Sequence, residues 1–440
     1  MRGLFMPSYT PSGTVTRMPI RDFLPALAAV VALLLPATSA AAADYVPGEV
    51  VVKREDGGSA RVHQIRDGDS VRETIAELRD RPGVEYAVPN HIARASQTFT
   101  PNDPAFRRQW NLFEPGGIGM PEAWSLAAAA GAPGGAGVVV AVLDSGVAFE
   151  RYKRYRRAPD LRKRTFVRGY DFIDRDAHPN DVYGHGTHVA GTIAQATNNR
   201  EGTAGIAYGA KIMPLRVLDS AGQGDSFAIA KAIRYAARRD VDVINLSLEF
   251  ELDVLPSEIP EILAAIRLAH RRGTLIVAAA GNGFGRRVAY PARADQVIAV
   301  GATTRSGCRS DYSNVGPDLD LVAPGGGVDA EPRTTQEFDI CEPGGASDWI
   351  FQETFRGTGV QKFGLPRGYE GTSMAAPHVS AIAALVIATG KVGPAPSPDA
   401  VQNHIQATAQ DLGRPGFDGR YGHGLVSAAA ALRCPPATAC

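Results

Sequence analysis

Residues 137-GVVVAVLD-144 form an apolar, β-branched run that ends in a carboxylate. A strand that is apolar on both alternating faces must be covered on both faces, which is typical of parallel sheets packed between helices. Similar runs recur along the chain and alternate with segments of helical period. The pattern predicts an α/β fold with a doubly wound, mostly parallel sheet flanked by helices. The expected strands are 137–144, 169–174, 211–218, 241–248, 274–282, 296–303 and 318–325, and the expected helices are 186–197, 225–239, 257–272, 373–390 and 398–411.

The composition is that of a folded protein. Of the 440 residues, 44% are hydrophobic and 21% are charged, and the length exceeds what one compact core usually needs. Lys plus Arg equals Asp plus Glu at 46 each. No excess positive charge therefore favours nucleic acid as a partner.

The first 43 residues resemble a secretory signal peptide. Arg17 and Arg21 precede the apolar run 24–35, and the small residues of 37–43 follow it. This order of charge, apolar run and A-x-A-like region predicts export and removal of residues 1–43. Met18 would give a more usual signal start than Met1. The alternative of a retained membrane anchor is disfavoured because the run is short for a span.

Residues 44–98 are expected to form a small separate α+β unit, before a larger domain at 99–440. A strand at 45–54, a helix at 71–83 and a strand at 84–92 follow from the alternating and helical patterns. A piece of about 50 residues buries too little surface to be robust alone. It therefore needs a partner surface.

The four cysteines all lie in the last third of the chain. An even count in an exported protein favours two disulfides, and four cysteines allow three pairings. The short loop between Cys434 and Cys440 favours that pair, which leaves Cys308 with Cys341. The spacings match no zinc pattern.

Two stretches interrupt the alternation of strands and helices. Residues 151–164 form a dense basic loop, interpreted as a solvated surface loop or as a contact for an anionic substrate or for self-processing. Residues 326–370 are long and Gly-rich and carry Cys341. Their length predicts a surface excursion.

Three side chains stand at strand ends or helix starts, where open α/β sheets place their sites. Asp144 ends an apolar strand, His185 precedes a Gly-rich helix start, and Ser373 enters an apolar helix. Serine is a weak nucleophile unless an imidazole takes its proton, and a carboxylate must orient that imidazole. These three residue types are the set that acyl transfer needs.

The motifs around these residues resemble those of the subtilisin-like serine proteases, the subtilases, and of their thermitase branch in particular. They are Asp-Ser-Gly at 144–146, HGTHVAGT at 185–192 and GTSMAAPHV at 371–379, in the chain order known for subtilisin. The resemblance spans about residues 100–432 and implies that Asp144 orients His185, that His185 is the general base and then acid, and that Ser373 is the nucleophile.

His185 and His188 lie three residues apart and could also form a metal-ligand pair. The resemblance instead implies a structural role for His188 and for His378. The zincin pattern H-E-x-x-H is absent, and no third ligand is placed.

The resemblance also implies an oxyanion donor at Asn282, which follows the apolar run 275–280. Its side-chain amide would act with the backbone N–H of Ser373. In this family, loss of the asparagine donor costs about 10²–10³-fold in turnover. The alternative is a turn asparagine before Gly283.

An extended substrate is expected to pair with two exposed edges, and the primary pocket is expected to be small to medium in size and apolar. The residues that the resemblance implies for the edges are Ser247, Leu248, Glu249, Ala221, Gly222 and Gly224, and those for the pocket are Ala279, Ala280, Gly281 and Ala289. Glu249 departs from the glycine usual in the family. It either puts negative charge near the cleft and favours basic side chains, or it points outward.

A structural calcium ion is the only cofactor that the resemblance implies, and no organic cofactor is expected. Carboxylate, amide and carbonyl oxygens suit this hard cation, although Asp and Asn also form turns. The implied ligands are the side chains of Asp103, Asp160 and Asn199 and the carbonyls of Ala196, Glu201 and Thr203.

These observations predict a secreted serine endopeptidase of broad specificity, made as a self-processing zymogen. The unit 44–98 resembles the subtilase propeptide, an inhibitor that also templates folding, and the processing junction is expected between Ala93 and Pro101. Two alternatives are a dedicated processing protease for one partner protein and a catalytically silent binding scaffold. The expected partners are peptide substrates and the chain's own propeptide. The mature enzyme is expected to be a monomer without a permanent membrane anchor.

Overall fold

A computed structural model describes residues 45–66, 69–92, 98–162, 165–330, 341, 348–357 and 359–436. The chain divides into two compact units, Met1–Ala93 and Arg94–Cys440. The predicted signal peptide at 1–43 and most of the predicted processing junction lie outside the described residues. No helix within the described ranges is long and apolar enough to cross a membrane.

The first unit is a three-stranded antiparallel sheet with one helix. Strand β1 (Tyr45–Arg54) lies between β2 (Arg61–Gln64) and β3 (Val84–His91), and helix α1 covers Val71–Arg79. Ser70 caps the helix by accepting the backbone N–H of Glu73 at 3.2 Å. The prediction of strand, helix and strand is confirmed. Strand β2 was not predicted because all four of its residues are exposed and carry no apolar alternation.

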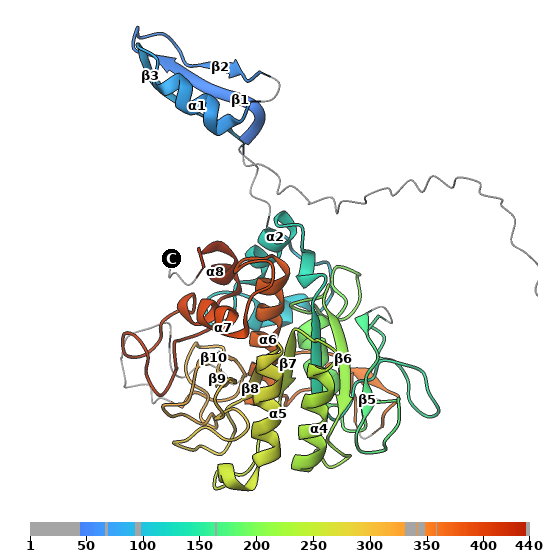
Figure 1. The fold of residues 1–440 in the computed structure, drawn as a ribbon. Coiled ribbons are helices and arrows are strands. Elements are labelled where there is room, and N and C mark those ends of the chain that lie inside the picture. Colours follow the sequence, from blue (N-terminus) through green and yellow to red (C-terminus); the bar gives the residue numbers. More distant parts are fainter. Residues whose placement is uncertain are drawn as a thin grey trace, which may run out of the picture. The chain divides into compact units, whose positions relative to one another are not determined.

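The second unit is built on a seven-stranded sheet with the strand order β10-β9-β8-β7-β4-β6-β5 (Figure 1). Every pairing in this sheet is parallel, and each of the seven predicted strands is confirmed. Most are shorter than predicted. The strands are β4 (Val139–Asp144), β5 (Tyr170–Asp171), β6 (Lys211–Arg216), β7 (Val243–Leu246), β8 (Leu275–Ala279), β9 (Ile298–Thr303) and β10 (Leu321–Pro324).

Helices cover both faces of the sheet, so the doubly wound prediction is confirmed. Helices α3 (His185–Ala194) and α6 (Thr372–Ala388) pack on one face. Helices α4 (Ser226–Ala237) and α5 (Pro260–Arg271) lie side by side on the other (Figure 1). Alternate residues of β4 face the two cores: Val140 and Val142 join one, and Ala141 and Leu143 join the other.

The C-terminal part adds helices α7 (Pro398–Ala407) and α8 (Ala428–Arg433). Ser397 caps α7, because its Oγ accepts the backbone N–H of Ala400 at 3.2 Å. Helix α8 packs against α2 (Met120–Ala129). Neither α2 nor α8 was predicted, since both are alanine-rich and have little polar–apolar periodicity. The excursion contributes the short strands β11 (Thr354–Phe355) and β12 (Phe363–Gly364).

The strand order places a switch point at β4. The chain passes from β4 to β5 and β6 on one side and then continues to β7 on the other. Ligands of open α/β sheets bind outside the carboxyl ends of the strands at such a point. Asp144 ends β4, Ser247 follows β7, and Asn282 follows β8, so three predicted site residues lie along this edge.

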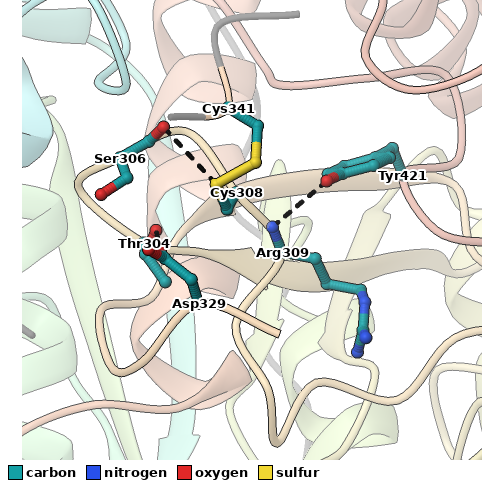
Figure 2. The surroundings of a disulfide bond; sticks show 7 residues. All are labelled: Thr304, Ser306, Cys308, Arg309, Asp329, Cys341 and Tyr421. Atoms are coloured by element: carbon teal, nitrogen blue, oxygen red, sulfur yellow. Dashed lines mark hydrogen bonds between the residues drawn. A yellow bond between two sulfur atoms is a disulfide. The ribbon is translucent and has the colours of Figure 1, made fainter. Parts of the chain in front are cut away.

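The disulfide between Cys308 and Cys341 is confirmed, and it ties the excursion to the segment after β9 (Figure 2). Beside it, the hydroxyl of Thr304 donates to Asp329 at 2.5 Å. Cys434 is also disulfide-bonded. Cys440, its predicted partner, lies outside the described residues.

Removing the 308–341 disulfide should destabilise the protein, because the bond closes a loop with a sequence separation of 33 residues. The paired substitution Cys308→Ser and Cys341→Ser is expected to lower the free energy of unfolding by about 3 kcal/mol and Tm by about 5 °C. Denaturant titration and calorimetry measure both quantities. Ser306→Ala, which leaves the disulfide in place, is the control. A loss below about 1 kcal/mol in the paired variant would contradict a stabilising role.

Candidate active site

A buried carboxylate and an imidazole meet at the end of β4. Asp144 is fully buried, and its Oδ1 lies 2.8 Å from Nδ1 of His185, the first residue of α3. The same oxygen accepts the backbone N–H of Ser145 at 2.7 Å. The bond to Nδ1 places the imidazole proton on that nitrogen and leaves Nε2 as the basic nitrogen.

The charge of Asp144 also governs the protonation of His185. Burial by itself would lower the pKa of this imidazole. The negative charge and the hydrogen bond of Asp144, together with the charge of Asp181, outweigh burial and raise the pKa above its ordinary value. The pair therefore stabilises the imidazolium that a general base becomes.

Asp181 is a buried carboxylate that the sequence analysis missed. Its Oδ1 accepts the hydroxyl of Ser145 at 2.8 Å and the N–H of Gly184 at 2.8 Å, and its Oδ2 accepts the N–H of Thr187 at 2.9 Å. Ser145 Oγ in turn accepts the N–H of Gly186 at 3.0 Å. The network ties the turn after β4 to the start of α3. Its sequence signal is an acid just before a helix start.

Ser373 is the second residue of α6 and faces the segment after β7. Its hydroxyl donates to the carbonyl of Ser247 at 3.2 Å, and Ser247 Oγ donates to the carbonyl of Ser373 at 2.8 Å. Both Ser373 and His185 line one cleft of about 530 Å³. In the described part of the chain, no hydrogen bond joins the Ser373 hydroxyl to the His185 ring.

Asn282 lies beside the nucleophile candidate at the N-terminus of α6. Its Oδ1 accepts both the N–H and the hydroxyl of Thr372, at 2.8 and 3.1 Å. These bonds fix the orientation of the amide and turn its Nδ2 donor away from Thr372. That Nδ2 lies 3.3 Å from Oε1 of Glu249.

The predicted substrate segments separate into two sets. The first set lines the same cleft as His185 and Ser373 and comprises Ala221, Gly222, Gly224, Ser247, Leu248 and Glu249. The second set is buried at the end of β8 and comprises Ala279, Ala280, Gly281 and Ala289. Tyr183 and Phe250 also line the cleft and were not predicted, and so does Gln223, which lies inside the predicted segment 221–224.

Glu249 is exposed, and its carboxylate turns toward the residues of the expected primary pocket. Its Oε2 accepts the backbone N–H of Asn282 at 2.8 Å. A Cβ placed on Gly281 would lie 2.2 Å from this oxygen and 3.1 Å from the side chain of Ala289. The space expected to be apolar therefore holds a carboxylate.

His188 and His378 have structural positions. His188 Nε2 lies 3.0 Å from the carbonyl of Ile350, its ring stacks on Tyr369, and burial lowers its pKa to about 3. His378 contacts Asn111 and the carbonyl of Met374, and burial lowers its pKa to about 4. Both rings are neutral at ordinary pH. Within the described ranges, no cluster of three or more His, Cys, Asp or Glu side chains is arranged to hold a metal.

The residues predicted to bind calcium come together around the loop 196–205. Asp103 accepts the backbone N–H groups of Asn198 and Asn199 at 2.7 and 3.0 Å. Asp160 accepts the side-chain amide of Asn199 at 2.6 Å and the N–H of Thr203 at 3.2 Å. Glu353, which the sequence analysis missed, accepts the N–H of Asp160 at 3.0 Å. No sequence pattern places Glu353 there, since it is separated from Asp160 by 193 positions.

No basic side chain among the described residues would offset the negative charge of these carboxylates when they are ionised. Asp103, Asp160 and Glu353 are at most 8% exposed, and none forms an ion pair with a described basic side chain. Burial raises the pKa of Asp160 to about 7, and the charge of Glu353 adds to the shift. No three acidic side chains of the described residues converge as metal ligands, but two buried carboxylates with amide and carbonyl oxygens are the donor types that a hard cation takes.

An orienting carboxylate, an imidazole and a serine at the carboxyl edge of a doubly wound sheet define a class, the serine hydrolases with an Asp-His-Ser arrangement. Residues 135–424 match the subtilase family. The chain belongs to this family and is a serine-type endopeptidase.

Relatives and solved structures agree with this assignment. The chain is 32% identical over 375 residues to a thermophilic serine proteinase of Bacillus sp. (strain AK1), covering 85% of this chain and 79% of that protein. It is 34% identical to thermitase of Thermoactinomyces vulgaris, with 67% and 87% covered. The solved structure of a protease from Pseudoalteromonas arctica PAMC 21717 superposes with a TM-score of 0.62 at 33% identity, covering 76% of this chain and 99% of that one.

Replacing Asp181 should disturb the site through His185. Asp181→Asn is expected to cost about 1–3 kcal/mol of stability, because it weakens several buried hydrogen bonds. It also removes a charge that raises the pKa of His185. A general base must be neutral, so the acidic limb of the kcat/KM profile should move to lower pH. Profiles recorded on a peptide substrate measure this shift.

The control for Asp181→Asn is Asp174→Asn, because Asp174 is an exposed partner of Arg216. Its effect on stability should stay below about 1 kcal/mol, with no shift of the acidic limb. An unmoved limb in Asp181→Asn, with active protein, would contradict the electrostatic role.

Proposed function

We propose that the chain is a secreted, self-processing endopeptidase that cleaves peptide bonds through an acyl-enzyme intermediate on Ser373. The observation that supports this most directly is the buried 2.8 Å contact between Asp144 and His185 in a cleft that also exposes Ser373. A silent binding scaffold would not need an imidazole with this orientation and this raised pKa.

The proposed reaction starts with a turn of the Ser373 hydroxyl from the Ser247 carbonyl to Nε2 of His185. Catalytic hydrogen bonds are often long or misaligned before substrate binds. His185 takes the hydroxyl proton as the oxygen attacks the peptide carbonyl, and Asp144 stabilises the imidazolium. The imidazolium then gives the proton to the leaving amine. Water repeats the sequence on the acyl-enzyme and releases the second product.

The negative oxygen of the tetrahedral intermediate needs donors in place beforehand. Asn282 is suited to this task because Thr372 already holds its amide orientation through two hydrogen bonds. The backbone N–H of Ser373 and the positive end of the α6 dipole lie on the same side of the site as this amide. We assign Asn282 and this N–H as the oxyanion hole.

Export and self-processing are proposed from the N-terminal region. A leader with basic, apolar and small-residue sections precedes a small α+β unit with a three-residue core of Val50, Leu78 and Ala87. Such a core supports little independent stability, which suits a propeptide that is removed. Its proposed role is to inhibit the enzyme and to help form the slow, long-range parallel pairings of the sheet.

Self-processing and nucleophile identity can be tested together. The full chain should convert to a shorter mature form and should react with a fluorophosphonate probe, which labels only an activated serine. Ser373→Ala should remain at full length and should not be labelled. Gel mobility, N-terminal sequencing and probe fluorescence report the outcome. The control is Ser257→Ala, at an exposed serine, which should mature and label like the parent. Processing by purified Ser373→Ala would exclude the self-processing proposal.

We also propose a structural calcium ion at the carboxylate group around the loop 196–205. The side chains of Asp103, Asp160 and Asn199, with the carbonyls of Ala196, Glu201 and Thr203, would hold it. Calcium would supply the charge that offsets Asp160 and Glu353 and would stabilise the loop. No step of the proposed reaction passes through it.

Chelation should therefore destabilise the folded enzyme. At calcium concentrations about 100-fold above Kd, the bound ion would contribute about 2.7 kcal/mol, so EGTA should lower Tm by several degrees. Asp160→Asn should melt at the same temperature with and without EGTA, whereas Asp399→Asn, at an exposed partner of His270, should keep the shift. Calorimetry measures these values. An unchanged Tm of the parent in EGTA would remove calcium from the proposal.

A further inference from the structure

We propose that the carboxylate of Glu249 selects substrates with a lysine or arginine side chain immediately before the cleaved bond. This inference rests on the proposed peptidase function and narrows it from broad cleavage to one class of peptide. The sequence alone left the direction of Glu249 open. The geometry of the cleft now supplies it.

The carboxylate of Glu249 contacts the segment after β8, although the residue as a whole is exposed to solvent. Its two oxygens contact the N–H and Nδ2 of Asn282 at 2.8 and 3.3 Å. One oxygen lies against the bare Cα of Gly281, where a Cβ would stand 2.2 Å away. Gly281 has φ +105, a backbone conformation that favours glycine. A Cβ at Gly281 would therefore collide with this carboxylate and with the side-chain amide of Asn314, which would lie 2.3 Å away.

Gly281 is directly joined to the nucleophile. The N–H of Gly281 donates to the hydroxyl of Thr372 at 3.1 Å, and Thr372 precedes Ser373. On the other wall, Ser247 exchanges two hydrogen bonds with Ser373. A substrate carbonyl placed at the Ser373 hydroxyl therefore directs the side chain of its own residue between the 247–249 segment and Gly281. That side chain ends at the carboxylate of Glu249.

The negative charge in this place has no partner of opposite sign among the described residues. Arg287 and Arg293 are the nearby cations, and their guanidinium groups bond to backbone carbonyls of the segment 252–254. Burial by the pocket walls raises the pKa of Glu249, and the charge of Glu251 raises it further. Glu249 nevertheless remains accessible from the cleft. An entering guanidinium or ammonium group would supply the missing counter-charge.

The contact with Asn282 links selection to the chemical step. An anionic Glu249 next to the amide opposes negative charge on an oxygen held by that amide. A cationic side chain bound between the walls neutralises this effect when the intermediate forms. A neutral side chain of the same shape leaves it in place. Discrimination should therefore be seen in kcat as well as in KM.

Two peptides that differ only at the residue before the cleaved bond test the proposal. One carries arginine and the other citrulline, which has nearly the same shape without the charge. The mature enzyme should favour arginine in kcat/KM by about 10-fold to 100-fold, the range for a hydrogen bond to a charged group. Glu249→Gln should reduce this ratio to below about threefold. Fluorophosphonate titration gives the concentration of active enzyme for each variant.

The matched control is Glu251→Gln. Glu251 lies two positions after Glu249 and carries an equal charge, but its side chain forms no hydrogen bond with Asn282. It should change the arginine-to-citrulline ratio less than threefold. If the arginine-to-citrulline ratio fell equally in both variants, the contact proposed for Glu249 would be overturned. The preference would then come from the summed negative charge of the cleft. A parent ratio near one, with both peptides cleaved, would overturn the proposal and leave the peptidase function intact. Absence of labelling and of cleavage would instead contradict the peptidase function.

The pH dependence of the arginine-to-citrulline ratio can be measured on the parent enzyme. It therefore tests the proposal even if Glu249→Gln does not fold. The titration of His185 acts on both peptides and cancels in the ratio. Glu249 is charged above its raised pKa, so the preference for arginine should be full at high pH and should fall as pH decreases through that pKa. A large ratio that stays constant from pH 4.5 to 8.5 would contradict the assignment to Glu249.

Discussion

The burial of β4 on both faces is the constraint on which the site depends. Val140 to Leu143 alternate between two apolar cores, so a charged side chain at these positions would be buried without a partner. Asp144 is the first position where the strand leaves both cores and meets polar groups. The parallel pairing with β6 and β7 then sets this carboxylate level with the ends of its neighbours. The remaining site residues are brought to that point by helices and loops that follow the same edge.

Two hydrogen-bond networks make this edge stiff enough for acid–base chemistry. Asp181 and Ser145 lock the start of α3 to the turn after β4, and the hydrogen bond from Asp144 orients the imidazole of His185. Thr372 does the same for Asn282 at the start of α6. In both cases the N–H groups at a helix start, which lack partners inside the helix, are used to hold a functional side chain. The same hydrogen bonds therefore stabilise the helix termini and set the geometry of the site.

The sequence was most informative where burial dictates the pattern. All seven strands of the large parallel sheet and five helices of the larger unit follow from apolar runs, caps and breaks. Strand β2 and helices α2 and α8 lacked such a signal, because β2 is fully exposed and the two helices consist largely of alanine. Motifs located Asp144, His185, Ser373 and Asn282.

Positions set by tertiary contacts escaped the sequence analysis. Asp181 acts through five hydrogen bonds, which only the folded loop brings together. Glu353 reaches Asp160 from almost two hundred residues away. The direction of Glu249 depends on whether Gly281, which follows β8, leaves room for its carboxylate, and no local pattern encodes that space.

The segment from Trp349 to Phe355 forms hydrogen bonds with three parts of the fold that are distant in sequence. The carbonyl of Trp349 accepts the indole N–H of Trp110 at 3.0 Å, the carbonyl of Ile350 meets His188, and Glu353 holds Asp160. Most of its residues are buried. A second molecule of the enzyme could cleave this segment only if the segment bound to it as an extended strand. Those contacts would first have to break by local unfolding. The packing of this segment therefore protects the inner part of the excursion from cleavage by other molecules of the same enzyme.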